Sequence, residues 1–451
     1  MSFRETVVGI LPADWKVDVI DNLKADKRNA ISMGPFGSKI KKECFVVSGI
    51  PIIRGTNLKP FYFNEDEFVF VSEEKSLELK SSFVERKDIV ITHRGTLGQV
   101  GYIPEGSKFQ KYIVSQSGMK LTCDENKIIS KFLYYYLNSS LGQYFLLMNR
   151  SQVGVPAIAQ ASTALKKIPV PIPSLPEQKA IAHILSTLDE KIAVNNQINK
   201  TLEKMAQAIF KQWFVDFEFP NEDGEPYQSS GGEMVESELG LVPKGWEVSS
   251  IDELAELIID YRGKTPKKLG RDWSETGIIA LSAKSIKNGR LVNLEQANRV
   301  DEELYSIWMK DELKYGDILM TSEAPLGELY YLASDDKYCL SQRLFAIRAE
   351  ESKMNSEVLF MFLKSSDVMK DIQNRATGTT VTGIRQSELR KVMLIKPDKN
   401  SQKEFQAIVS KILKKINLNE RESIKLGKIR VMLLPELMSG KIRVPYENMK
   451  F

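Results

Sequence analysis

The chain has 451 residues, a length that suits two to four domains and can bury substantial hydrophobic cores. Its composition, 42% hydrophobic and 27% charged, is that of a globular protein, and its net charge of +4 permits a nucleic-acid partner without arguing for one. Three scattered cysteines and only two histidines argue against a disulfide framework and against a metal or acid–base site built on histidine. No apolar run is long enough to span a bilayer and no basic-then-apolar leader is present, so we expect a cytoplasmic protein without a membrane partner.

Residues 1–173 are predicted to form a mixed α/β domain. Short runs of β-branched and aromatic residues, such as 68–71, 89–92 and 112–114, predict strands, and turns rich in glycine and proline separate them. One apolar helix is expected at 132–137, ahead of a loop that leads into the next segment.

The next segment, residues 174–218, is predicted to be one long helix. Ser174 suits the N-cap, Pro176 suits the first turn, and Glu177 places a carboxylate near the positive end of the helix dipole. Apolar residues then recur with a heptad period in two rows, which is the pattern of a coiled-coil seam. The predicted seam consists of Ile181, Leu188, Asn195, Leu202 and Ile209 in the first row, and Ile184, Ile198 and Met205 in the second.

Residues 240–398 are predicted to be a second copy of the first domain. Gly9 and Trp15 return as Gly240 and Trp246, and the spacing between matching residues shrinks along the chain as small insertions and deletions accumulate in loops. The chain is therefore a tandem duplication. Further matching pairs are 89–92 with 318–321, Ser115-Gln116 with Ser341-Gln342, and 132–137 with 359–363.

A second long helix is expected at 399–440, and it repeats the heptads of the first helix at a constant offset along the chain. Its own start, Ser401-Gln402-Lys403-Glu404, lacks the Pro-Glu-Gln of the first. Residues 219–239, between the first helix and the second domain, are acidic and rich in glycine, serine and proline, and predict a linker; residues 441–451 form a tail. The seam residues of the second helix are Phe405, Ile412, Asn419, Leu426 and Leu433, with Ile408 and Ile429 in the second row.

The expected fold is therefore mixed α/β, with two duplicated domains separated by two long antiparallel coiled-coil helices and an internal pseudo-twofold symmetry. Asn195 and Asn419 interrupt the same heptad row at equivalent positions. Equivalent residues of an antiparallel pair meet near its twofold axis, so we expect these two amides to hydrogen-bond and to fix the register of the helices.

The sequence offers no convincing catalytic centre. It has no Pro-Pro pair, which an amino-group methyltransferase acting on DNA would carry in an Asn/Asp-Pro-Pro-aromatic segment, and no G-x-x-x-x-G-K-[ST] phosphate loop. Short Glu-x-Lys triplets occur at the frequency expected of a chain this charged, and the second half does not repeat them. We therefore expect a non-catalytic chain that binds neither cofactor nor metal.

Basic loops at equivalent points of the duplication give a better indication of binding. Lysine and arginine in such loops would neutralise phosphates, while asparagine, glutamine and arginine could contact base edges in the major groove. The alternative interpretation of any single cluster is an ordinary solvent-exposed loop that does not bind DNA. The candidate DNA-binding residues are Lys39, Lys41, Lys42 and Arg94 in the first half, and Arg262, Lys264, Lys267, Lys268, Arg271, Lys284, Lys287 and Arg290 in the second.

Over essentially its full length the chain resembles the specificity subunits of type I restriction–modification systems. The same order of motifs occurs in both halves of the chain, and a long helix follows each half. This repeated order is far more specific to the family than any single motif. The segments that carry the resemblance are 9–15 with 240–246, Gly34-Pro35-Phe36-Gly37-Ser38, Arg94-Gly95-Thr96, 168–173 leading into Glu177-Gln178, 209–217, and 230–234.

This resemblance implies two target-recognition domains, each reading one half of a split, asymmetric DNA site. It also implies that the long helices space the half-sites and dock two modification (methyltransferase) subunits, and that restriction subunits join to form the nuclease. S-adenosylmethionine, ATP and Mg²⁺ would then be used by those partners. Two other classes stay open: a duplicated coiled-coil scaffold without DNA binding, and an enzyme such as a fused nuclease, which would need a metal-binding carboxylate cluster.

Overall fold

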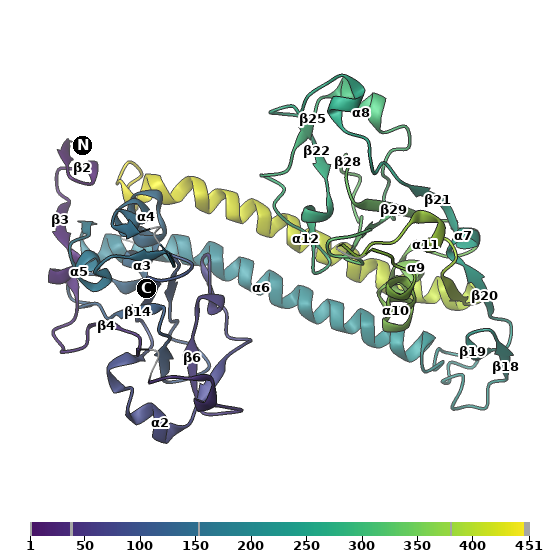
Figure 1. The fold of residues 1–451 in the computed structure, drawn as a ribbon, viewed down its shortest axis with the longest axis horizontal. Coiled ribbons are helices and arrows are strands. Elements are labelled where there is room, and N and C mark those ends of the chain that lie inside the picture. Colours follow the sequence, from purple (N-terminus) through teal and green to yellow (C-terminus); the bar gives the residue numbers. More distant parts are fainter. Residues whose placement is uncertain (1, 37–38, 152–153, 379–380, 446–451) are drawn as a thin grey trace. The chain divides into compact units, whose positions relative to one another are not determined.

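The computed structural model describes residues 2–36, 39–151, 154–378 and 381–445 (Figure 1). The chain divides into two compact units. Unit 1 contains residues 1–195 and 422–451, and unit 2 contains residues 196–421. Two long helices, α6 (Leu175–Phe214) and α12 (Lys399–Met438), each contribute about half of their length to each unit.

Unit 1 is built from small, mostly antiparallel sheets and short helices. A five-stranded sheet has the order β10-β13-β6-β9-β5, a four-stranded sheet has the order β12-β11-β14-β4, and β3 pairs with β17. The strands are β1 (Phe3–Thr6), β2 (Gly9–Pro12), β3 (Lys16–Val19), β4 (Ile31–Met33), β5 (Phe45–Val46), β6 (Ile50–Ile53), β7 (Leu58–Lys59), β8 (Tyr62–Phe63), β9 (Val69–Val71), β10 (Phe83–Val84), β11 (Ile89–Thr92), β12 (Val100–Tyr102), β13 (Tyr112–Val114), β14 (Gly118–Leu121), β15 (Arg150–Ser151), β16 (Ala157–Ile158) and β17 (Pro169–Ile172). The short helices are α1 (Ile20–Leu23), α2 (Glu73–Leu77), α3 (Ser130–Asn138), α4 (Ser140–Leu147) and α5 (Ala161–Lys166).

Unit 2 repeats this plan, with a four-stranded sheet of order β21-β29-β26-β27 and a three-stranded sheet of order β25-β22-β28. The strands are β18 (Met234–Ser237), β19 (Gly240–Pro243), β20 (Glu247–Ser250), β21 (Ala255–Ile259), β22 (Ile278–Leu281), β23 (Ile286–Lys287), β24 (Arg290–Leu291), β25 (Arg299–Val300), β26 (Ile318–Thr321), β27 (Leu329–Tyr331), β28 (Cys339–Leu340), β29 (Leu344–Ala349) and β30 (Met393–Lys396). The short helices are α7 (Ile251–Leu254), α8 (Glu302–Trp308), α9 (Ser356–Lys364), α10 (Ser366–Asn374) and α11 (Gln386–Leu389). The predicted duplication of a mixed α/β fold is confirmed.

The long helices run antiparallel within each unit. In unit 1, Asn195 donates to Glu422 at 2.8 Å, and Asp189 pairs with Arg430. An earlier residue of α6 therefore contacts a later residue of α12, as expected of antiparallel helices. In unit 2, Asn419 donates to Asn199 at 2.8 Å, while nearer the end of α6 the rings of Phe214 and Phe405 meet. The hydrogen bond expected between Asn195 and Asn419 joins residues of different units and stays a prediction.

The buried seam includes a row that lies one position away from the predicted second row. Leu185, Asn199, Ala206 and Trp213 of α6 are buried, as are Val409 and Leu437 of α12, and the residues of the first row are buried or half-buried. Residues four positions apart lie on the same side of a helix, so this row and the first row can both face the partner helix. A search for large apolar residues does not reveal this row, because it contains the polar Asn199 and the small Ala206. Of the predicted second row, Ile184 is half-buried against the core of unit 1, whereas Ile198, Met205, Ile408 and Ile429 are 38–49% exposed.

A buried glutamine fixes the start of each long helix against its own domain. The Gln178 amide donates to the carbonyl oxygens of Pro173 and Lys127, and its own carbonyl accepts from the Ile129 backbone at 2.8 Å, just before α3. Gln402 makes the matching contacts in unit 2, ahead of α9. This pair explains why glutamine persists at both starts although the preceding proline and glutamate do not. Within the described residues, no helix combines the length and the apolar character that crossing a membrane requires.

Candidate nucleic-acid interface

In the described part of each unit, one pair of strands is parallel, and the carboxyl ends of these two strands share an edge. In unit 2, β22 and β28 pair in parallel, with Ala280 opposite Cys339. The chain leaves β22 through residues 282–285, which we call the edge loop of unit 2, and leaves β28 through residues 341–343. The backbone N–H of Ala283 donates to the Gln342 carbonyl, so the two loops are tied together. Loops at such an edge present side chains to a ligand from a rigid base.

A polar cleft of about 660 Å³ opens at this edge of unit 2. Four side-chain amides and one guanidinium contribute to its lining, and these groups form the bidentate hydrogen bonds by which proteins read base edges. Trp273, which is 39% exposed, adds an aromatic face. The polar and charged residues of the cleft are Ser282, Lys284, Ser285, Asn293, Gln296, Asn298, Ser341, Gln342 and Arg343.

Arg343 is held in a defined position within this cleft. It has a left-handed backbone, with φ of 65°, and its carbonyl accepts a hydrogen bond from the Ser322 N–H. Its guanidinium pairs with the Glu323 carboxylate at 2.9 Å while half of the side chain stays exposed. A guanidinium oriented by a carboxylate can donate its remaining N–H groups to an incoming acceptor without a large loss of side-chain entropy.

Unit 1 has the same parallel pair, between β6 and β13, and its edge loop is residues 54–57. Asn57 is fully buried and holds this loop: its amide donates to the carbonyls of Asn64 and Glu67, and its side-chain oxygen accepts from the Arg54 N–H. Gln99 donates to two further carbonyls of the same turn, those of Gly55 and Leu58. The exposed side chains at this edge are Arg54, Thr56, Arg94 and Gln116.

The Gly-Pro-Phe turn before the first basic cluster packs directly on this edge. A Cβ atom at Gly34 would lie 1.9 Å from the Ser115 carbonyl oxygen, so the close approach requires glycine. The turn leaves Phe36 78% exposed. The remaining motif residues, Gly37 and Ser38, lie outside the described residues, and Lys39, Lys41 and Lys42 follow as exposed side chains around a single helical turn.

A buried polar residue follows the equivalent strand, β11 or β26, next to each of the two edges. His93 follows β11, and burial lowers its pKa, so the imidazole is neutral near pH 7. Ser322 follows β26 in unit 2 and is 1% exposed. The two edges therefore share a backbone plan and differ in side-chain chemistry.

Four of the predicted DNA-binding cations already have partners within unit 2. The Arg262 guanidinium makes two hydrogen bonds of 2.8 Å to Asp260 and lies over the Phe345 ring, and Lys264 donates to the Trp308 carbonyl. These contacts hold both side chains in defined positions, and their binding to DNA stays a prediction. The other two are Arg271, which pairs with Asp301 and Glu303, and Arg290, which reaches the long helices.

The other candidate cations keep exposed side chains, and Lys284 belongs to the polar cleft itself. The Lys268 ammonium also donates to the Gly263 carbonyl at 2.8 Å. The sequence interpretation missed Arg54, Asn293, Gln296, Asn298 and Arg343. The repeated Ser-Gln pair directly after a strand was the available indication, because it marks the same strand end in both halves. Among the described side chains, no cluster of three or more His, Cys, Asp or Glu could hold a metal ion.

Comparison with known proteins gives consistent matches. A family model for the "Type I restriction modification DNA specificity domain" matches residues 37–204 and again 243–428. The chain is 25% identical to the MjaIX type I restriction enzyme specificity subunit of Methanocaldococcus jannaschii, over 98% of this chain and 96% of that protein. It is 25% identical to the HindI specificity subunit of Haemophilus influenzae, over 76% of this chain and 84% of that one. The crystal structure of the specificity subunit from M. genitalium shares the fold, with a TM-score of 0.56, 15% identity, and 94% and 96% coverage of the two chains.

Proposed function

The chain belongs to the family of type I restriction–modification DNA specificity subunits, and we propose that it selects a bipartite DNA site, with one half read by each unit. One observation carries this proposal. The same strand-end edge occurs twice, and the two copies bear different polar side chains. Arg54, Arg94 and Gln116 occupy the edge of unit 1, whereas the edge of unit 2 bears the polar cleft. Two unlike edges would read two unlike half-sites.

The recognition domains in this proposal span residues 1–173 and 240–398, with 219–239 as the connection and 441–451 as the tail. The helices at 174–218 and 399–440 would set the spacing of the two half-sites. We expect this chain to act in the cytoplasm as a non-catalytic subunit. Methylation and ATP-driven cleavage would belong to modification and restriction subunits that use S-adenosylmethionine, ATP and Mg²⁺.

Two equivalent apolar surfaces support the docking of two modification subunits. Val194 of α6 and Leu418 of α12 directly precede the matching Asn195 and Asn419, and they are 52% and 54% exposed. Met205 and Ile429 are likewise equivalent in the two helices and are 49% and 42% exposed. Unit 1 therefore carries Val194 and Ile429, and unit 2 carries Leu418 and Met205. Exposed apolar residues repeated at equivalent positions are expected where two copies of one protein bind.

Sequencing of DNA methylation in the host, with and without this gene, tests the proposal. We expect one bipartite, asymmetric methylated motif that disappears on deletion and returns with the gene on a plasmid. An unchanged methylation pattern, together with a purified complex that binds scrambled DNA as tightly as host DNA, would favour the scaffold interpretation.

A further inference from the structure

Each edge loop runs without a spacer into a two-stranded hairpin. In unit 1, the edge loop ends at Asn57 and β7 begins at Leu58, and β8 completes the hairpin. In unit 2, the edge loop ends at Ser285 and β23 begins at Ile286, followed by β24. No residue separates loop from hairpin in either unit, so a displaced hairpin must displace the edge loop.

The hairpin of unit 1 is held by an arginine from the long helix α12. Phe61, at the turn, has a left-handed backbone with φ of 58°. The Arg430 guanidinium lies 3.8 Å from the centroid of the Phe61 ring, and the Tyr135 ring stacks on Phe61 with centroids 6.2 Å apart. A guanidinium over an aromatic face is a directional contact that lysine does not reproduce well.

Arg430 is itself fixed by the other long helix. It forms an ion pair with Asp189 of α6, and the Tyr135 hydroxyl donates to the same carboxylate at 2.6 Å. The side chains of Arg430 and Asp189 are 15% and 10% exposed, so the pair is largely removed from water. Hairpin, α3, α6 and α12 thus meet in one contact.

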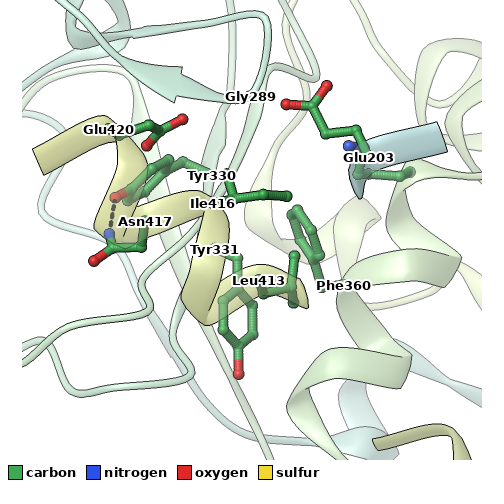
Figure 2. A pocket seen from close by; sticks show the side chains of 10 residues that line it. Glu203, Gly289, Tyr330, Tyr331, Phe360, Leu413, Ile416, Asn417 and Glu420 are labelled. Atoms are coloured by element: carbon green, nitrogen blue, oxygen red, sulfur yellow. Dashed lines mark hydrogen bonds between the residues drawn. The ribbon is translucent and has the colours of Figure 1, made fainter. Parts of the chain in front are cut away.

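The hairpin of unit 2 is held by the reverse arrangement, with the arginine on the hairpin. Arg290 of β24 donates to the Asn196 side-chain oxygen of α6 at 2.9 Å. It also lies 3.6 Å from the carboxylates of Glu203 on α6 and Glu420 on α12. Figure 2 shows Glu203 and Glu420 on either side of the small cavity, of about 40 Å³, that Gly289 helps to line.

The two contacts share their geometry but not their residues. Counting from the strand ends, Gly289 stands where unit 1 has Phe61, and Arg290 stands where it has Tyr62. A ring from the hairpin meets an arginine of the helices in unit 1, and an arginine from the hairpin meets carboxylates of the helices in unit 2. In both units an arginine links the hairpin to the two long helices, although every residue that takes part differs between the units. Packing alone would not require an arginine at this contact in both units.

We propose that Arg430 in unit 1 and Arg290 in unit 2 are positioning residues for DNA recognition, each fixing the hairpin, and with it the edge loop, on the long helices. This inference rests on the proposed function and deepens it. Each residue acts on the half-site read by its own unit, and neither is required to touch DNA.

The test uses the full chain in complex with its modification subunits, and duplexes in which one half of the methylated site is scrambled. The discrimination ratio is the affinity for the intact site divided by the affinity for the half-scrambled duplex. Arg430→Lys and Phe61→Leu should lower this ratio about tenfold at one half-site, and Arg290→Gln should do so at the other. The matched control is Arg421→Gln, because Arg421 also lies on α12 but its ion pair with Asp336 is exposed. This variant should leave both ratios unchanged.

Because Arg430 and Asp189 are both nearly buried, the double variant Asp189→Asn/Arg430→Gln removes both charges together and avoids a stranded carboxylate. It should fold and show the same loss at the same half-site as Arg430→Lys. Equal losses at both half-sites, or lower thermal stability with unchanged discrimination ratios, would overturn the inference. A parent complex that binds intact and scrambled sites equally would instead overturn the proposed function, and this inference with it.

Discussion

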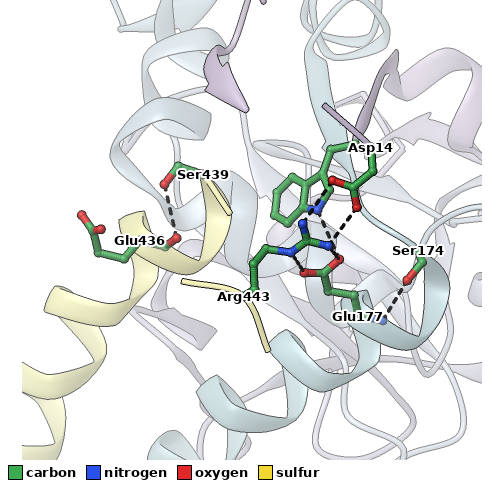
Figure 3. Close-up of polar contacts among 7 residues, drawn as sticks. Asp14, Ser174, Glu177, Glu436, Ser439 and Arg443 are labelled. Atoms are coloured by element: carbon green, nitrogen blue, oxygen red, sulfur yellow. Dashed lines mark hydrogen bonds and ion pairs between the residues drawn. The ribbon is translucent and has the colours of Figure 1, made fainter. Parts of the chain in front are cut away.

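The indole Nε1 of Trp15 donates a hydrogen bond of 3.2 Å to the Glu177 carboxylate at the start of α6. The same contact recurs in unit 2 between Trp246 and Asp398, at 2.8 Å, although the acidic residue comes from a different position in the helix start. In unit 1, Arg443 of the tail completes the arrangement by bridging Glu177 and Asp14 (Figure 3). Arg443 thereby contacts both the first domain and the first long helix.

Arg443→Gln should destabilise unit 1 by about 3 kcal/mol, because it leaves the nearly buried Glu177 carboxylate without its cation. The hydrogen bond from Arg443 also lowers the pKa of Asp14, which is consistent with an attractive contact. Thermal unfolding followed by calorimetry checks this prediction. Arg421→Gln breaks an exposed ion pair and should change stability by less than about 1 kcal/mol. Similar effects of the two variants would show that the Arg443 bridge is only a surface contact.

Glu420→Gln should remove a pH dependence of unit 2. Burial raises the pKa of Glu420 to about 7, from 4.5 in an exposed chain, although Arg290 opposes this effect. The folded state then binds the proton more tightly, so this contribution to stability is complete below about pH 4.5 and is lost as the pH rises through about 7. The glutamine variant should therefore be more stable than the parent above about pH 8, by about 1–3 kcal/mol, and similar to it near pH 5.

Melting curves of parent and Glu420→Gln across this pH range measure the effect. Glu404→Gln, an exposed position on the same helix, is the control and should follow the parent at every pH. A parent whose stability does not fall between about pH 5 and pH 8 relative to Glu420→Gln would contradict the prediction.

Substitutions in the polar cleft of unit 2 should separate base reading from phosphate binding. Gln342→Ala should cost about 1–3 kcal/mol of discrimination at one half-site, as expected for the loss of a bidentate base contact. Lys284→Ala should weaken binding to every sequence and reduce the log–log salt slope by roughly 0.9. Titrations at several salt concentrations distinguish the two effects, with Gln373→Ala on the exposed face of α10 as control. A salt slope unchanged by Lys284→Ala would show that this lysine does not contact phosphate.

The duplication and the long helices were predictable because they depend on local, repeated patterns. Heptads and matched Gly and Trp positions survive in the sequence even where the contacts change. The burial of Asn199 and Ala206 in the seam was not predictable from the pattern of apolar residues, because neither is a large apolar side chain. The shared role of Glu177 and Asp398 was equally unpredictable, because they stand at different positions of the two helix starts and only the fold shows that both accept from a tryptophan.

The residues that line the candidate site are harder to recognise in the sequence, for a related reason. Charge alone cannot separate Arg262, paired with the nearby Asp260, from an exposed lysine such as Lys284. Arg290 finds its partners on α6 and α12, which are distant from it in the sequence. The amides of the polar cleft are uncharged and follow no periodic pattern in the sequence. They meet at one edge because β28 and β25 both pair with β22.

The last prediction concerns the exposed apolar residues on the long helices. Leu418→Asp places a carboxylate in the surface proposed to bind one modification subunit, and burial of an unpaired charge there should prevent that docking. The equivalent surface in unit 1, around Val194, is untouched, so the variant should bind one modification subunit where the parent binds two. Native mass spectrometry of the reconstituted complex measures this stoichiometry. Ile424→Asp is the matched control: Ile424 is 43% exposed and lies further along α12, about 240° around the helix from Leu418. It should retain two subunits, whereas Val194→Asp/Leu418→Asp should retain none. If the double variant still binds two modification subunits, these residues do not form the docking surface, and the contacts must lie on the recognition domains instead.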